Sequence, residues 1–116
     1  MALKVLQKNW QFQVVYRQGK KIICKHAIVF YHRCHLEGEN PRFGFVASKR
    51  VGSAVKRNRA KRILKEAFRQ ISKELEHQNF WIVAVAKASI GDATYQETLM
   101  DLRERLAAGG LLKDEA

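Results

Sequence analysis

Hydrophobic residues recur with helical spacing near the start of the chain. Asn9 can cap a helix, and Gly19 stands where a C′ residue would end it. Between them, Phe12, Val15 and Tyr16 occupy positions i, i+3 and i+4 of one helical face. This pattern predicts a short amphipathic helix between Asn9 and Gly19.

A longer helical pattern follows Gly52, where Ser53 can cap a helix that runs from Ala54 to about Glu76. At 100° per residue, its positions separate into an apolar face and a polar face. The apolar face holds Ala60, Leu64, Ala67, Phe68, Ile71 and Leu75, and the polar face holds Asn58, Arg59, Arg62, Lys65 and Arg69. We expect the first face to lie in the core and the second to lie in solvent.

The third helical pattern lies near the C-terminus. Thr94 and Glu97 have the spacing of a capping box, and Gly109 with Gly110 can close the helix. Its apolar positions are Tyr95, Leu99, Leu102 and Leu106. We expect these positions to face the core.

The other apolar segments lack helical spacing and predict strands. Residues 22–33 are rich in β-branched and aromatic residues and form one or two strands. Residues 37–41 supply turn residues before a second extended run over residues 42–48, so we expect these two extended segments to pair as an antiparallel hairpin. Residues 80–86 are continuously apolar, which is typical of a strand buried on both faces.

Taken in order, the elements predict an α+β fold of the type α-β-β-(β)-α-β-α, in which the bracketed β is one optional additional short strand early in the chain. We expect a two-layer sandwich with a small mixed sheet, because a strand, a long helix and another strand form a crossover that usually makes the two strands parallel. The chain has neither repeats nor Pro/Gly-rich linkers. We therefore expect a single domain over residues 1–116, with a flexible tail at residues 109–116.

The longest apolar run, residues 80–86, is far shorter than the roughly 20 residues of a membrane-spanning helix. Residues 1–11 also lack the apolar core of a secretory signal peptide. The sequence therefore predicts a cytoplasmic protein without a membrane partner.

The formal charge of +11 is concentrated in the first part of the chain. Residues 1–35 hold seven Lys/Arg and no acid, and residues 49–69 hold nine Lys/Arg and one acid, Glu66. From residue 70 onward, eight acids outnumber five bases. A positive field confined to one part of a protein indicates a polyanionic partner.

The cations are densest at the start of the long predicted helix, where residues 56–62 contain five of them. Like charges at i, i+4 repel one another, and a phosphate backbone would offset that repulsion. Arginine offers a planar fork to phosphate oxygens, and an asparagine can contact a base or a ribose 2′-hydroxyl. The candidate RNA-binding residues are Lys49, Arg50, Lys56, Arg57, Asn58, Arg59, Lys61, Arg62 and Lys65.

Cys24, Cys34, His26, His32 and His35 are the residues that could form a disulfide or a metal site. On a single strand the two cysteines would lie roughly 30 Å apart, too far for a disulfide or a shared ion. Neither a CxxC nor an HxxxH spacing is present. We expect two reduced thiols and no metal held by the protein.

One long segment resembles a known family. Residues 44–62, GFVASKRVGSAVKRNRAKR, are similar to the signature of the bacterial ribonuclease P protein family, including the central triplet Arg57-Asn58-Arg59. The resemblance extends to the helix that ends at Gly19, the aromatic strand at Phe30, and residues 80–106.

The resemblance implies a subunit that binds a large catalytic RNA and helps it remove the 5′ leader from precursor tRNA. The RNA and its Mg²⁺ ions would carry the chemistry, so no catalytic residue is expected here. It also implies a left-handed βαβ crossover, as in the second domain of ribosomal protein S5. By the same resemblance, the single-stranded leader would bind between the sheet and the long helix, on Phe12, Tyr16 and Phe30. Bases of any identity can stack on aromatic faces, and ordinary core packing is the alternative role of each ring. Val85-Ala86-Lys87 departs from the family, which often has an arginine there.

Three other functions share some of these features. A ribosomal protein or RNA chaperone would carry a similar cationic helix. A protein nuclease would need clustered carboxylates or paired histidines, and the basic part of the chain is poor in acids. A duplex-DNA reader is not expected because the helix-turn-helix spacing is absent.

Overall fold

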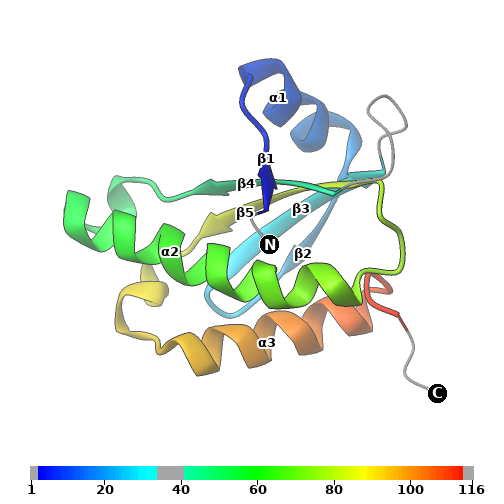
Figure 1. Ribbon diagram of the computed structural model, residues 1–116. Coiled ribbons are helices and arrows are strands. Elements are labelled where there is room, and N and C mark those ends of the chain that lie inside the picture. Colours follow the sequence, from blue (N-terminus) through cyan, green and yellow to red (C-terminus); the bar gives the residue numbers. More distant parts are fainter. Residues whose placement is uncertain (1–2, 34–40, 114–116) are drawn as a thin grey trace.

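The computed structural model describes residues 3–33 and 41–113 as a mixed α+β domain (Figure 1). The strands are β1 (Lys4–Val5), β2 (Lys20–Ile23), β3 (Ala27–Arg33), β4 (Arg42–Val46) and β5 (Phe80–Ala86). The helices are α1 (Asn9–Gln18), α2 (Ala54–Ile71) and α3 (Tyr95–Ala108), with short 3-10 helices η1 (Lys49–Val51), η2 (Ser72–Glu74) and η3 (Ala88–Asp92). The α+β class is confirmed, and β2, β3 and β4 occupy the strand positions predicted between the first two helices. The predicted succession does not include β1, which precedes α1.

The five strands form one mixed sheet in the order β1-β4-β5-β3-β2. β4 pairs in parallel with β1 and β5, while β3 pairs antiparallel with β2 and β5. The apolar strand β5 is buried along almost its whole length, as its composition predicts. The predicted crossover is present, since α2 connects the parallel strands β4 and β5.

The predicted hairpin between residues 22–33 and residues 42–48 is wrong. β3 and β4 do not pair, because β5 lies between them and pairs with both. A continuously apolar strand buries most surface at the centre of a sheet, where a strand covers each of its edges. The observed hairpin joins β2 to β3, and residues 37–40 of the predicted turn lie outside the described residues.

Helices cover both faces of the sheet (Figure 1). α2 and α3 lie on one face over the main core, and the predicted apolar positions of α2 and α3 are buried there except Tyr95, which is half-buried. α1 lies on the opposite face, where Val15 packs with Leu6, Trp81 and Val83 in a smaller cluster. The sheet with α2 and α3 makes the two predicted layers, and α1 adds a partial third.

The helix ends differ slightly from the predictions. α2 ends at Ile71 and continues only as η2, and Lys8 rather than Asn9 caps α1. Gly19 has an extended φ of −85°, so it is not a left-handed C′ residue. The position requires glycine because a Cβ would lie 2.4 Å from the Val15 carbonyl oxygen and 2.5 Å from that of Tyr31.

The flexible tail predicted from residue 109 is wrong for residues 111–113. Leu111 and Leu112 are buried, and Leu112 forms an antiparallel bridge with Leu75. The Lys113 amide donates to the Glu74 carbonyl at 2.7 Å. Residues 114–116 lie outside the described residues.

Candidate nucleic-acid interface

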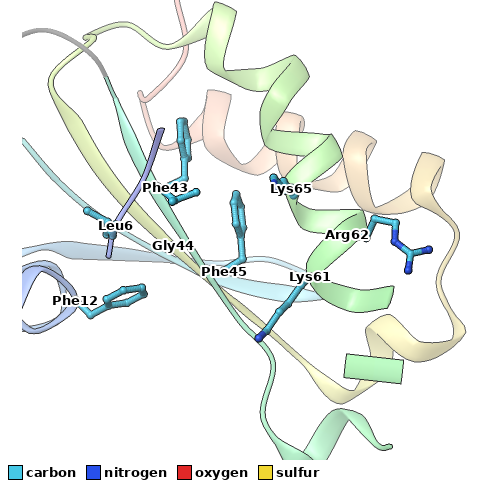
Figure 2. A pocket seen from close by; sticks show the side chains of 9 residues that line it. Leu6, Phe12, Phe43, Gly44, Phe45, Lys61, Arg62 and Lys65 are labelled. Atoms are coloured by element: carbon cyan, nitrogen blue, oxygen red, sulfur yellow. The ribbon is translucent and has the colours of Figure 1, made fainter. Parts of the chain in front are cut away.

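A cleft of about 440 Å³ lies between α2, the outer edge of β4 and α1 (Figure 2). We call it the basic cleft. Lys61, Arg62 and Lys65 of α2 line one side, and residues 43–45 of β4 line its base. The other side is formed by Val5, Leu6 and Phe12. The lining therefore combines cations with aromatic and aliphatic groups, and no acid is among the described residues that line it.

The helical repeat places Arg57, Lys61 and Lys65 on successive turns along one side of α2. Figure 2 shows Lys61 reaching from α2 toward β4, whereas the guanidinium of Arg62 points away from the sheet. Within the described residues, none of these four side chains has a hydrogen bond or an ion pair. Their charges are available to a ligand.

Arg59 lies elsewhere on α2 and contacts η3. Its guanidinium donates to the carbonyl oxygens of Ile90 at 3.5 Å, Gly91 at 3.4 Å and Ala93 at 3.1 Å. Three carbonyl acceptors around one guanidinium make a clamp between α2 and η3. The structure thus separates Arg59 from the cations at the basic cleft, although both belong to the predicted RNA-binding set.

The remaining predicted RNA-binding residues lie near the start of α2. Lys49 and Arg50 are exposed on η1, and Lys56 and Asn58 are exposed on α2. Ser48 and Ser53 fix these segments, because their hydroxyls accept from the Arg50 and Lys56 amides. The cationic surface therefore continues from the basic cleft around the N-terminal end of α2.

The predicted leader aromatics lie on the α1 side of the sheet, and only Phe12 lines the basic cleft. Phe30 and Gly44 both pair with Val83, so these positions share one face of the sheet. The Tyr16 ring meets Phe30 edge to face, with ring centroids 5.0 Å apart, and partial burial raises the pKa of Tyr16. Tyr16 and Phe30 form an aromatic pair beside the cleft rather than inside it.

Gly44 determines where the Phe12 ring lies. A Cβ on Gly44 would stand 2.4 Å from Cε1 of Phe12, so only glycine allows the ring to rest on β4. The sequence prediction included Phe12 and omitted its contact Gly44. It also omitted Phe43 and Phe45, although aromatic residues on both sides of a glycine at the start of the family signature were a usable signal.

We expect Gly44→Ala to lower the free energy of unfolding by about 1 kcal/mol, because the added methyl forces the half-buried Phe12 ring to move. Thermal unfolding measures this change. Gly91→Ala is a matched control, since its Cβ would meet only the Val51 carbonyl oxygen at 4.0 Å. Equal stability of the two variants would contradict the assigned contact.

The cysteine and histidine residues do not form a site within residues 3–33 and 41–113. No group of three or more metal-binding side chains comes together there. Cys24 is buried, and this burial, with a smaller effect of Asp101, raises the pKa of its thiol to about 11. His26 is buried with Nδ1 2.9 Å from the Ser89 hydroxyl. His32 is half-buried on β3, whereas Cys34 and His35 lie outside the described residues.

No helix in the described part of the chain has the length and apolar character needed to span a bilayer.

Sequence comparisons identify relatives over nearly the whole chain. The family model Ribonuclease P matches residues 2–108. The ribonuclease P protein component of Fusobacterium nucleatum is 36% identical over 104 residues, which cover 86% of this chain and 91% of the relative. The ribonuclease P protein component of Symbiobacterium thermophilum is 34% identical over 110 residues, which cover 95% of this chain and 94% of the relative.

Solved structures show the same fold. An RNase P protein from Staphylococcus aureus matches with a TM-score of 0.81 and 25% identity, covering 93% of this chain and 96% of that chain. The RNase P protein from Thermotoga maritima matches with a TM-score of 0.75 and 20% identity, covering 87% of this chain and 93% of that chain. At that lower identity the likeness concerns the fold alone.

A mixed sheet that carries a cationic helix beside an aromatic strand defines a small RNA-binding protein. Because the family model spans most of the chain and the relatives exceed 30% identity over it, the chain belongs to the ribonuclease P protein family. Proteins of this family are subunits of the endoribonuclease that processes tRNA 5′ ends, so the role in tRNA 5′ processing that the sequence resemblance implies is confirmed.

Proposed function

We propose that this chain binds the catalytic RNA of ribonuclease P through the cationic surface of η1 and α2, and the 5′ leader of precursor tRNA in the basic cleft. The observation that carries the proposal is the row Arg57, Lys61 and Lys65, whose charges have no partner in the described part of the chain. The row borders a cleft lined by Phe12 and β4. Cations for phosphates beside an aromatic surface for bases suit single-stranded RNA.

The proposal assigns different parts of the surface to the two RNAs. Lys49, Arg50, Lys56 and Asn58 form an exposed region suited to a folded RNA backbone. The basic cleft is concave and has room for unpaired nucleotides. Phe12 is the stacking residue within the cleft, and the Tyr16–Phe30 pair extends the aromatic surface beside it.

In this proposal the chemistry belongs to the RNA, with Mg²⁺ as the metal of the assembled enzyme in the cytoplasm. The protein contributes by neutralising phosphates where two RNA backbones approach each other. Fewer Mg²⁺ ions are then needed to hold the RNAs together, so the protein's effect is greatest at low Mg²⁺.

Recovery of RNA with the tagged full-length chain from cells tests the proposal. We expect one abundant structured RNA, and we expect it to cleave precursor tRNA at the mature 5′ end when recombined with the purified chain at low Mg²⁺. Bulk ribosomal RNA without cleavage activity would contradict the assignment of partners. Cleavage by the chain free of RNA would contradict the assignment of the chemistry to RNA.

A further inference from the structure

The outer edge of β4 is only partly covered by β1. β1 has two residues, which pair with Arg42 and Phe43, and the Leu6 amide then donates to the Phe43 carbonyl at 2.8 Å. After Leu6 the chain leaves the sheet and enters α1. Within residues 3–33 and 41–113, the part of β4 beyond Phe43 therefore has no neighbouring strand on this side.

The direction of the Phe43 carbonyl determines which groups remain uncovered. Backbone groups of successive residues in a strand point to alternate sides, so Phe43 and Phe45 face the β1 side while Gly44 faces β5. In the described part of the chain, no strand lies opposite Phe45 on this side, and no hydrogen bond involves its N–H or C=O. One backbone donor and one acceptor are thus left at the base of the basic cleft.

These groups lie among residues suited to a nucleotide. Phe45 lines the cleft between Phe12 on one side and Lys61 and Lys65 on the other (Figure 2). Each of the four bases presents a hydrogen-bond donor beside an acceptor on its Watson–Crick edge. The cations would meet the flanking phosphates while the aromatic ring meets the face of a base.

We propose that the backbone N–H and C=O of Phe45 form a base-reading site, which hydrogen-bonds the Watson–Crick edge of one unpaired leader nucleotide held in the basic cleft. The proposal rests on the proposed function of the cleft, and it adds a hydrogen-bonding contact to stacking and charge. A donor beside an acceptor distinguishes a base from an abasic sugar more strongly than it distinguishes one base from another.

A peptide strand is the other occupant that an uncovered strand edge can take. It would need a row of free backbone groups, whereas β4 ends at Val46 and, among the described residues, offers only those of Phe45 on this side. The cations of α2 also suit a phosphate chain, because none of the described residues that line the cleft is an acid that would balance them. The observations therefore favour a nucleotide.

The test removes the Phe45 N–H and keeps the side chain, by incorporating phenyllactic acid at position 45 so that an ester replaces the amide. The control makes the same amide-to-ester replacement at Tyr95, by incorporating the hydroxy acid that carries the tyrosine side chain. That residue begins α3, where a first-turn N–H has no helical acceptor. Both variants are assembled with the catalytic RNA, and binding is measured for precursor tRNAs carrying an abasic site at each leader position in turn.

With the unmodified chain, we expect one leader position at which base removal weakens binding about fivefold, the usual effect of one lost hydrogen bond. With the ester at position 45 of the protein, precursor tRNA with an intact leader should bind about fivefold more weakly. Removing the base at the sensitive leader position should then weaken binding by a correspondingly smaller factor. The ester at position 95 should change neither the affinity for the intact leader nor the effect of base removal.

Full affinity with the ester at position 45, together with tighter binding of leader-bearing than of leaderless tRNA, would overturn the base-reading site and leave the proposed function intact. Equal binding of tRNAs with and without a leader would overturn both.

Crosslinking provides a measurement that needs no altered backbone. Leaders that carry 4-thiouridine at single positions are irradiated on the assembled enzyme with the unmodified chain. We expect one position to crosslink to Phe12 or to residues 43–46. Crosslinks confined to other regions of the chain would overturn the proposal.

Discussion

Replacing both Lys61 and Lys65 with alanine should weaken the binding of precursor tRNA to the assembled enzyme by about tenfold to a hundredfold. Both side chains line the basic cleft, and neither has a hydrogen bond or an ion pair within the described residues. An exposed ion pair contributes up to about 1 kcal/mol, so two lost phosphate contacts give an effect of this order. The plot of log affinity against log salt should become shallower by about 2, because each lysine releases about one counterion.

The matched control removes the same charge from another part of the molecule. Lys73 and Lys113 are exposed and lie away from the basic cleft, so the Lys73→Ala, Lys113→Ala double variant should bind almost normally. Equal losses in the two double variants would show that net charge, and not the cleft, determines affinity. An unchanged salt dependence in the cleft variant would likewise contradict direct phosphate contacts.

The order of helices and strands could be predicted because each element carries its own periodic pattern. α2 shows this best, since Ser53 caps it and the positions predicted to be apolar are buried. Strand neighbours could not be predicted in the same way. The pairing of β5 with both β3 and β4 is a long-range choice, determined by which strand buries the most apolar surface at the centre of the sheet.

The cations of the candidate site could be identified from the sequence, but their separation into different surfaces could not. Arg57 and Arg59 are two residues apart, which places them about 200° apart around a helix. The helical repeat alone therefore directs them to different sides of α2. What the sequence does not reveal is that η3 lies beside α2 and presents three carbonyl groups to Arg59.

The aromatic part of the site could also be predicted only by residue and not by its position in the fold. Phe12 could be identified as a candidate because the family resemblance points to it, and its residue type suits base stacking. Its place in the cleft depends on Gly44, which belongs to a strand distant in sequence, and on β1 ending before it reaches Phe45. Both are contacts between distant segments, and no local pattern contains them.

Arg57→Ala and Arg59→Ala should have opposite effects, although the two residues belong to one triplet. Arg59→Ala should lower the free energy of unfolding by about 2 kcal/mol, because a charged donor is lost from three carbonyl oxygens. Arg57 makes no side-chain hydrogen bond in the described part of the chain, so Arg57→Ala should change stability by no more than about 0.5 kcal/mol. Denaturant unfolding of the free protein measures both values.

For RNA binding, Arg57→Ala should have the larger effect and Arg59→Ala the smaller. Arg57→Ala should lower the salt dependence of RNA binding by about 1, which is the effect of one lost phosphate contact, whereas Arg59→Ala should leave it unchanged. Arg59→Lys separates charge from geometry, because lysine keeps the positive charge but lacks the fork that reaches several carbonyls. If Arg59→Lys restored stability, or if Arg59→Ala reduced the salt dependence, Arg59 would be a phosphate contact and not a clamp on η3.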